Sequence, residues 1–549
     1  MQISATTADT MPHYQVRPNG ATPGFVAGFS ILAASLANFL NFQSYPYMKT
    51  EVLVAFAILV LASYAASIIY RASPKVLRKL MEAFLLALLI DLHFLSELQH
   101  ALYLMAGLFA LLVFVDRSVV KPLAIFSALI MIATVAGAFG QSPWVVTKID
   151  GREAARLASD AKIFARPAVV HIILDEHIGF GGLPENAEGR AMERQLVQSY
   201  LAEGFRIYPR AYSEHMHTIN AIPAMLDFGD GHPVSADMNG MVLDKAEWFQ
   251  KINALGYNLS IYQPEFADYC SANTPTHCVE YAHDSLLPVL DTDLAWRERL
   301  QLLLSKFVKL SVILHFAHNV AYWAVMTAFG WDDLTLSEAR IINHTSTISS
   351  LHMFKAVTER ASDLRAGEAL FFHALLPHYP YATREDCAIK QLDEWRKRRE
   401  VVPMEVRREA YYQQAFCAFQ LVKTVLEAVE RSPAGRNVYV VVHGDHGSRI
   451  TNQDPTAEQA TQRRDDLRAS FSTLLAIRVP GQTEGIDNTL TPVSAALESV
   501  ALKEFKDFPD MPSTTTPIVM LDDANWAPTR EFDLPIDLFD TITDKYNAE

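Results

Sequence analysis

The stretch Val440–Ile450, VVVHGDHGSRI, joins an apolar run to an abrupt polar ending. Its three valines are β-branched and typical of a buried strand, and its two glycines enclose the pair Asp445 and His446. An Asp at the end of a strand is by itself commonly a turn former. In open α/β sheets, however, ligands gather beyond the carboxyl ends of the strands. The interpretation of this stretch therefore depends on how the other strands end.

Strand and helix patterns alternate through most of the chain after Pro167. This alternation predicts an α/β domain with a largely parallel sheet sandwiched by helices. The acidic segment after Phe508 is expected to form loops with a single strand. Strands are predicted at Pro167–Leu174, Phe205–Tyr208, Asn258–Gln263, Ala369–Leu376, Asn437–Val442, Phe471–Val479 and Pro517–Leu521, and helices at Gly189–Ala202 and Val406–Val429.

Three of the apolar runs are followed by residues of types that commonly bind metals. The first is followed by Asp175 and Glu176, the stretch quoted above ends with Asp445 and His446, and a third, less regular run is followed by His378. Carboxylates and imidazoles from three strand ends form a candidate metal site. Glu176 can point toward or away from that site, because neighbouring strand residues face opposite sides.

The segment Tyr212–Gly229, YSEHMHTINAIPAMLDFG, places Thr218 before a helix pattern at Ile219–Leu226. One interpretation is that Thr218 is only a helix N-cap. The other is that its hydroxyl lies where the helix amino terminus would stabilise a bound phosphate. A metal bound to that hydroxyl would lower its pKa and make it a nucleophile. The residues alone leave both interpretations open.

The amino-terminal part of the chain is strongly apolar between residues 23 and 140, which predicts a transmembrane domain of about five helices. The third and fourth of these are short or interrupted by Asp91 and His93. The five expected spans are Gly24–Phe42, Val52–Tyr70, Leu80–Leu95, Ala101–Val115 and Pro122–Phe139.

Basic residues in the loops between these spans predict the orientation. The positive-inside rule places residues 1–22 and the two basic loops in the cytoplasm. Residues 141–166 then form a partly helical connector, and residues 167–549 an extracytoplasmic domain on a bacterial-type cytoplasmic membrane. The basic loop residues are Arg71, Lys75, Arg78, Lys79, Arg117 and Lys121.

A further apolar block, Leu302–Trp331, is long enough for a sixth span. Lys306, Lys309, His315 and His318 interrupt it, and such groups are costly in a bilayer centre. We therefore expect a buried or interfacial helix pair resting near the membrane.

The four cysteines fit an oxidising compartment. Cys270 and Cys278 close a short loop and are expected to form a disulfide. Whether Cys387 and Cys417 form a second one is left open. The formal net charge of −15 argues against a nucleic-acid partner.

The ordered set IILDE, HTINAIPAML, LPHYPY and VVVHGDHGSR resembles the alkaline phosphatase/sulfatase superfamily. More narrowly, it resembles the membrane-anchored branch with lipoteichoic acid synthases and phosphoethanolamine or phosphoglycerol transferases. Those proteins also join about five amino-terminal spans to an extracytoplasmic catalytic domain. The resemblance covers most of the chain after about Pro167, together with the topology before it.

The resemblance implies a role for each matching residue. Thr218 matches the nucleophile that becomes phosphorylated, and His378 matches the histidine that holds the substrate phosphate or the departing group. The implied metal ligands are Asp175, Thr218, Asp445 and His446. One divalent ion is implied, zinc or manganese, and the mixed oxygen and nitrogen ligands suit either.

The implied reaction is transfer of a phosphoryl-linked head group from a phospholipid donor to an envelope glycan or lipid acceptor. Thr218 lacks the Cys/Ser-x-Pro-x-Arg signal of formylglycine sulfatases, which counts against sulfate-ester hydrolysis. The chain also has fewer cysteines than phosphoethanolamine transferases usually have. A hydrolase of the same fold and an inactive membrane scaffold are the alternatives.

Several residues beside these candidates are expected to have supporting roles. A histidine next to a ligand is more commonly a residue that supports the ligands than a ligand itself. Arg449 is expected at the surface, although an arginine there would also suit a phosphate. The neighbouring histidines are His177, His215, His217 and His443.

Overall fold

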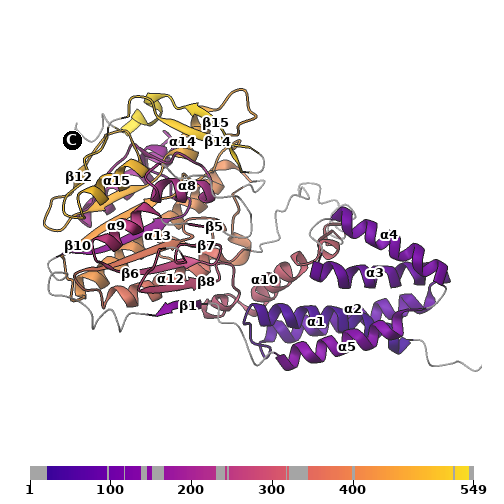
Figure 1. Ribbon diagram of the computed structural model, residues 1–549. Helices are drawn as coiled ribbons and strands as arrows, with labels where there is room; N and C mark the ends of the chain where they lie inside the picture. Colours follow the sequence, from indigo (N-terminus) through magenta and orange to yellow (C-terminus); the bar gives the residue numbers. More distant parts are fainter. Residues whose placement is uncertain are drawn as a thin grey trace, which may run out of the picture. The chain divides into compact units, whose positions relative to one another are not determined.

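The computed structural model of the protein divides into two compact units (Figure 1). The helical unit comprises Met1–Ser142 and Leu300–Asp332, and the sheet unit comprises Pro143–Arg299 and Asp333–Glu549. The structure describes residues 21–94, 98–115, 118–137, 145–150, 166–229, 241–243, 246–271, 273–316, 318–320, 344–398, 402–512, 514–523 and 526–542.

The helical unit contains five helices at about the expected positions. Helix α1 packs against α2 and α5, and α3 packs against α4. They are α1 (Ala21–Phe42), α2 (Thr50–Ala72), α3 (Lys75–Phe94), α4 (Leu98–Val115) and α5 (Val120–Gly137).

The prediction of about five spans is not supported by these helices. Among the described residues, only Gly24–Phe42 and Thr50–Ala72 are long and apolar enough to cross a membrane. The apolar stretches of α4 and α5 are shorter, Gln99–Phe114 and Val120–Thr134. Helix α3 carries too many charged side chains for a bilayer core. The finding supports a membrane protein with at least two candidate spans.

The block Leu302–Trp331 is described up to residue 320, apart from residue 317, and it packs on the amino-terminal helices. Helix α10 (Trp296–Lys309) and the following helix, Val312–Val320, bend by 119° at their junction. The pair would be a third span if it crossed the membrane as one broken helix. Buried Asp91 accepts hydrogen bonds from Ser311 Oγ and from the backbone N–H of Ile313, the latter at 3.1 Å. That this block rests on the membrane surface stays a prediction.

The sheet unit is built on one nine-stranded sheet. Its five central strands are parallel neighbours, and the remaining pairings include antiparallel ones at both sides. The α/β domain with a largely parallel sheet is thus observed. The strands in spatial order are β1 (Val145–Asp150), β8 (His277–Tyr281), β6 (Asn258–Pro264), β9 (Glu368–Ala374), β2 (Ala168–Leu174), β10 (Val438–Gly444), β11 (Leu475–Arg478), β3 (Arg206–Ile207) and β12 (Gly485–Ile486).

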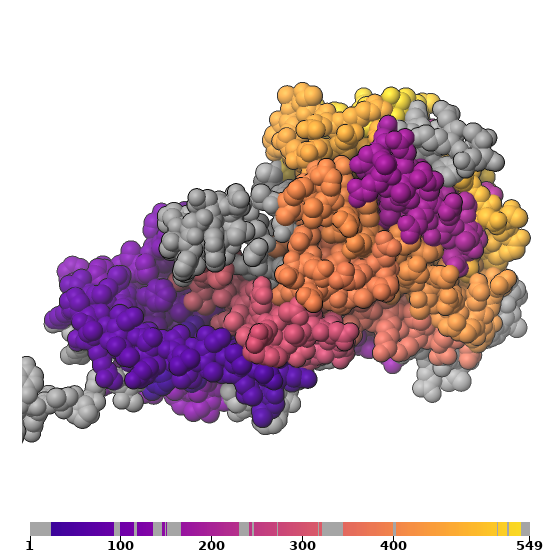
Figure 2. All heavy atoms as spheres, turned by 180° about the vertical axis from the view of Figure 1, so that it is seen from behind, coloured from indigo at the N-terminus to yellow at the C-terminus, as the bar shows by residue number. Residues whose placement is uncertain are grey.

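Helices cover both faces of this sheet (Figure 1). Every residue of β2, β9 and β10 is buried, as near-continuous apolar parallel strands require. Alternate residues of β2 enter two different cores, Val170 and Ile172 on one face and Val169 and Ile173 on the other. The first face carries α7 (Ala187–Ala202), α12 (Ser346–Ala361) and α13 (Met404–Arg431), and the second carries α8 (Thr218–Leu226), α9 (Glu247–Ala254) and α15 (Val493–Leu502). Figure 2 shows α7 lying against α13 on the first face.

The connector and the tail differ from their predictions. The described part of the connector forms β1, an edge strand paired antiparallel with β8, where a partly helical segment was expected. Residues 151–165 of the connector and 1–20 of the amino-terminal segment lie outside the described residues. The tail forms a hairpin of β14 (Ile518–Asp522) and β15 (Pro528–Asp533) where one strand was expected.

Smaller elements and two disulfides complete the sheet unit. The expected disulfide Cys270–Cys278 is present, and Cys387–Cys417, which the sequence left open, is present as well. The smaller elements are η2 (Phe180–Gly182), β4 (Ala211–Tyr212), β5 (Met241–Val242), β7 (Ala267–Asp268), η3 (Leu287–Asp291), η4 (Leu392–Glu394), α14 (Arg464–Phe471), β13 (Thr491–Pro492) and η5 (Ile536–Ile542).

Candidate functional site

Strand register brings the predicted strand ends together. The last residue of β10, Gly444, pairs with Leu174 of β2, and Leu174 pairs with Ala374 of β9. Asp175 and Asp445 therefore each follow directly after a paired strand end. The three strand ends singled out in the sequence thus lie side by side at one edge of the sheet.

Asp175, Asp445 and His446 form a buried cluster at this edge. Each offers one potential ligand atom, and these atoms all lie within 4.8 Å of one another. His446 Nε2 lies 3.4 Å from Asp445 Oδ2 and 3.8 Å from Asp175 Oδ1. The three side chains are at most 3% exposed. Two carboxylates and one imidazole at this spacing are a donor set that zinc or manganese accepts.

The hydrogen bonds around this cluster leave His446 Nε2 and Asp445 Oδ2 available to a ligand. His446 Nδ1 donates to the carbonyl oxygen of Gly447 at 2.8 Å, so its Nε2 carries the lone pair. Asp445 Oδ1 accepts from the backbone N–H groups of Glu176, at 2.9 Å, and His446, at 2.8 Å. The buried Asp445 Oδ2 has no hydrogen-bond partner among the described residues. A nitrogen lone pair facing carboxylate oxygens is repulsive unless a cation lies between them, so these residues fit a metal ion.

The pKa shifts of the three residues are also those expected for a buried metal site. Burial, the charge of Asp445 and that of Glu176 raise the pKa of Asp175 well above its usual range. Burial raises the pKa of Asp445 to about 6. Burial and the nearby Arg449 lower the pKa of His446 well below its usual range. A divalent cation would offset the cost of keeping both carboxylates ionised in this buried place.

Thr218 lies at the amino terminus of α8 and faces the same cluster. Thr218 is the first residue of the helix, and the preceding His217 occupies the N-cap position without a capping side-chain hydrogen bond. Thr218 Oγ1 donates to Asp175 Oδ1 at 3.4 Å and lies 3.4 Å from His446 Nε2. The N-cap interpretation therefore does not describe its surroundings. Its hydroxyl therefore lies next to two candidate ligands and at the positive end of the α8 helix dipole.

Glu176 points away from the cluster, toward two arginines. Its backbone adopts a positive φ of 62°, and its side chain is fully buried. Glu176 Oε1 accepts from Arg449 Nε at 3.1 Å and from Arg398 Nη1 at 3.4 Å. Burial would raise the pKa of Glu176, but His378 and the two arginines outweigh it and lower that pKa. The sequence left the direction of this side chain open.

The prediction of a surface position for Arg449 is wrong. Arg449 is 7% exposed, because it is ion-paired with Glu176 from a strand end 273 residues earlier in the chain. With Arg398 and Arg407 it lines a cavity of about 760 Å³. Cavities of roughly 300–1,000 Å³ are typical of small-molecule sites.

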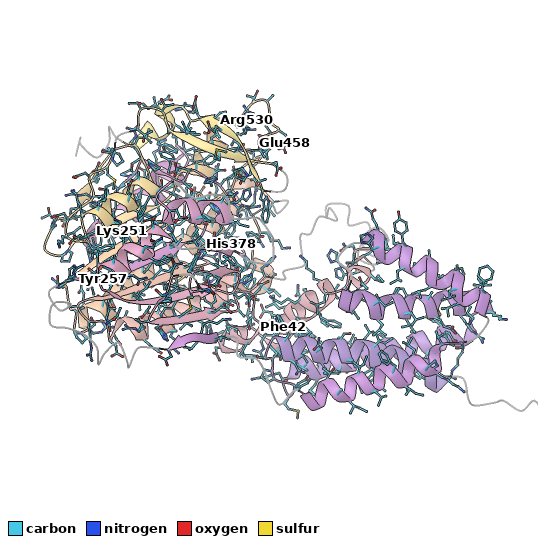
Figure 3. The ribbon with its side chains drawn as sticks, viewed as in Figure 1. Phe42, Lys251, Tyr257, His378, Glu458 and Arg530 are labelled. Atoms are coloured by element: carbon cyan, nitrogen blue, oxygen red, sulfur yellow. A yellow bond between two sulfur atoms is a disulfide. The ribbon has the colours of Figure 1, made fainter. Side chains whose placement is uncertain are left out.

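His378, labelled in Figure 3, follows β9 in the chain. It lies beside Glu176 and is not part of the three-residue cluster. Its Nδ1 donates to the carbonyl oxygen of Tyr379 at 2.7 Å, and its Nε2 lies 3.8 Å from Glu176 Oε1. Burial lowers the pKa of His378 to about 4, so the ring is neutral near pH 7. Its position is compatible with contact to a group bound next to the cluster.

The carboxy-terminal hairpin adds residues that the sequence did not single out. His217 Nδ1 bonds to Asp522 Oδ2 at the end of β14, and the His217 ring stacks on Trp526 with centroids 5.2 Å apart. Asn220 Nδ2 donates to the carbonyl oxygen of Trp526 at 2.9 Å. Asp522 ends a predicted strand just as Asp175 does, and this was the signal by which it could have been found.

The other flanking histidines lie outside the cluster. His443 Nε2 and His171 Nε2 are 2.7 Å apart between β10 and β2, and His177 Nδ1 bonds to the carbonyl oxygen of Ile178 at 2.9 Å. Burial lowers the pKa of His215. None of these contacts includes an atom of the three-residue cluster.

Comparisons with known proteins give similar folds only among solved structures. No protein-family model and no curated protein matches the sequence. The periplasmic domain of EptC from Escherichia coli, in complex with zinc, is similar at 10% identity over 69% of this chain and 94% of that one, with a TM-score of 0.38. The phosphonate monoester hydrolase of Agrobacterium radiobacter gives 11% over 65% and 81%, with a TM-score of 0.37. A 2-O GAG sulfatase gives 11% over 65% and 78%, also with a TM-score of 0.37.

These solved structures are thus a periplasmic domain with zinc, a phosphonate monoester hydrolase and a sulfatase. Their identities to this chain are near one tenth and their TM-scores lie below 0.5.

Proposed function

We propose that the protein is a membrane metalloenzyme of the alkaline phosphatase/sulfatase superfamily. It transfers a phosphoryl-linked head group, such as phosphoglycerol or phosphoethanolamine, from a lipid donor to an envelope glycan or lipid acceptor. The observation that carries this proposal is the convergence of Thr218 Oγ1, Asp175 Oδ1 and His446 Nε2 at the amino terminus of α8. The sheet unit would face the extracytoplasmic side, as the basic loops predict.

Four side chains would hold one divalent metal ion, zinc or manganese. These are Asp175, Thr218, Asp445 and His446. The other side-chain polar atoms of Asp445 and His446 are hydrogen-bonded to the backbone. When bound, such an ion would lower the pKa of the threonine hydroxyl and stabilise negative charge on phosphoryl oxygens.

The chain's own residues account for a double displacement. Thr218 Oγ attacks the phosphorus, the bond from phosphorus to the diacylglycerol oxygen breaks, and that oxygen leaves with the proton that Thr218 gives up. The amino terminus of α8 stabilises charge on the phosphoryl oxygens. An acceptor hydroxyl then attacks the phosphothreonine, the bond from phosphorus to Thr218 Oγ breaks, and Thr218 regains a proton.

Residues around the cluster would bind the substrate and fix the ligands. The backbone N–H of Glu176 holds Asp445 through Oδ1, which keeps Oδ2 directed at the cluster. His378 would contact the phosphate or the departing group. The cavity lined by Arg398, Arg407 and Arg449 also carries Asp454 and Glu458, and its guanidinium groups would contact an anionic part of the substrate.

Product analysis with the full chain tests the proposal. The purified, metal-loaded protein is incubated with head-group-labelled phosphatidylglycerol, with and without candidate acceptors, and quenched in acid. Label on Thr218 by peptide mass spectrometry, followed by label on an acceptor, is the expected result. Label released only as free head group would mean a hydrolase of the same fold. A metal-loaded protein that never becomes labelled and never turns over the lipid would contradict the proposal and favour a scaffold.

A further inference from the structure

The helical unit contains a partly open cavity of about 410 Å³ that the proposed chemistry does not use. Its walls come from α1, α2 and α3, with single residues from α4 and α5. They are almost entirely apolar or small side chains. The volume lies in the range of roughly 300–1,000 Å³ that is typical of ligand sites.

Small residues on two facing helices create this space. Gly24 and Gly28 on α1 lie opposite Ser63 and Ser67 on α2, with the same spacing of four residues on each helix. A Cβ at Gly28 would lie 3.9 Å from Ser63 Oγ, and a Cβ at Gly24 would lie 3.8 Å from Tyr70 Cδ1. Small residues at this spacing ordinarily let membrane helices pack closely. The Cβ distances show that α1 and α2 pack in this way at both glycines, and the cavity lies beside that contact.

The Ser63 hydroxyl gives the cavity one polar group that a bound molecule could contact. It lines the cavity, is 4% exposed, and its Oγ has no hydrogen-bond partner among the described residues. A buried hydroxyl without a partner is costly in apolar surroundings. An acceptor oxygen on a bound molecule, such as an ester carbonyl, would satisfy it.

Basic residues border the cavity at one end. Three lining residues are each next in the sequence to a basic residue, and Arg78 lies with its guanidinium carbon 5.8 Å from the centre of the Tyr70 ring. The pairs are Tyr70 with Arg71, Leu80 with Lys79, and Val120 with Lys121.

One carboxylate offsets part of this charge. Glu82 is buried, lies 3.3 Å from Lys79 Nζ, and accepts hydrogen bonds from Tyr70 Oη at 2.8 Å and from Ser118 Oγ at 2.9 Å. Arg71 and Lys121 are exposed. This end of the cavity therefore keeps an excess of positive charge, which attracts anionic lipid head groups.

We propose that this cavity binds the glycerol and ester part of an anionic glycerophospholipid, from which an acyl chain continues along the helices beyond Ser63. An ester oxygen accepts a hydrogen bond from Ser63, and the phosphate lies at the end bordered by Arg71 and Lys121. The site belongs wholly to the helical unit, whereas the candidate catalytic residues all belong to the sheet unit. The proposal therefore does not depend on the proposed reaction.

Lipid retention by the full chain tests this inference. Wild-type protein is purified in a mild detergent, incubated with phosphatidylglycerol or phosphatidylcholine, washed, and analysed for bound lipid by native mass spectrometry. Two variants fill the cavity, Gly28→Leu and Ala66→Phe. The matched control is Gly107→Leu on α4, where an added Cβ would meet no atom within 4 Å.

The expected result is one phosphatidylglycerol per chain in the wild type and in Gly107→Leu. Retention should fall by about tenfold or more in Gly28→Leu and Ala66→Phe, a difference of about 1.4 kcal/mol or more. The double variant R71Q/K121Q should retain lipid but lose the preference for phosphatidylglycerol over phosphatidylcholine.

Equal retention by Gly28→Leu and Gly107→Leu would overturn the proposal, as would equal retention of the two lipids by the wild type. If a cavity-filling variant does not fold, the wild type still decides. A phosphatidylglycerol with a photoreactive group on its acyl chain should label peptides of α1 and α2. Labelling confined to other helices would contradict the assigned site.

Discussion

The Asp445→Asn variant should be more stable than the wild type when metal is removed. Asp445 Oδ1 accepts two backbone hydrogen bonds, which an asparagine oxygen can keep. Within the described part of the chain its Oδ2 has no hydrogen-bond partner, and it lies 3.4 Å from His446 Nε2, which carries a lone pair. An asparagine amide at that place donates a hydrogen bond and carries no charge, so it removes both the buried charge and the repulsion.

The size and pH range of this effect follow from the pKa of Asp445. Burial raises that pKa from 3.8 to about 6. At 1.36 kcal/mol per unit, ionising Asp445 costs the folded state about 3 kcal/mol. The penalty is absent below pH 3.8, grows between pH 4 and 6, and is constant above. Asp445→Asn should therefore gain about 3 kcal/mol at pH 8 in a chelator, or a rise in Tm of about 4 °C for a unit of this size.

Thermal unfolding of the full chain at pH 4.5 and pH 8 measures this difference. The control is Asp386→Asn, an exposed carboxylate whose Oδ1 also accepts a backbone hydrogen bond, from Ala388 at 3.0 Å. Adding zinc or manganese at 100 times its Kd should stabilise the wild type by about 2.7 kcal/mol and Asp445→Asn much less. The reasoning is refuted if Asp445→Asn is the less stable protein at pH 8 in chelator, or if metal stabilises both proteins equally.

Three further changes have defined outcomes. Thr218→Ala should lower kcat on labelled lipid by at least about 1,000-fold and abolish the acid-stable label on the protein. Thr218→Ser should keep part of the activity and part of the label. A Thr218→Ala protein that is active without becoming labelled would exclude a phosphothreonine. Arg449→Met leaves buried Glu176 without its main partner and should cost about 3–5 kcal/mol of unfolding free energy in denaturant titrations, with partial recovery in E176Q/R449M. A double variant that is no more stable than Arg449→Met would count against the ion pair. The variant C270S/C278S opens a short loop and should lose about 2.5 kcal/mol, while unchanged stability would show that this disulfide does not constrain the unfolded chain.

The sheet and the central candidate residues could be predicted because both depend on local patterns. β-Branched runs mark β2 and β10, and parallel pairing aligns their ends without further information. The convergence of Asp175 with Asp445 therefore follows from two strand assignments and one rule of α/β sheets. Thr218 required one further step, from a helix start to the same sheet edge.

The residues that could not be predicted depend on contacts between distant segments. Arg449 looks like a surface residue until Glu176 lies beside it, and the positive φ of both residues gives no signal in the sequence. Strand β1 exists only because β8 provides an edge for Val145–Asp150. The prediction of about five spans is not supported, because the apolar stretches of α4 and α5 are short and α3 carries charged residues, among them Asp91, which accepts a hydrogen bond from Ser311.

Anomalous diffraction from crystals of the full chain, grown with zinc or manganese, tests the central claim most directly. The account predicts one anomalous peak bounded by Asp175, Thr218, Asp445 and His446, with ligand atoms at about 2.0–2.3 Å from the ion. Loss of that peak in Asp445→Asn would confirm the assignment. A metal-saturated crystal with no anomalous density among these four residues would contradict it.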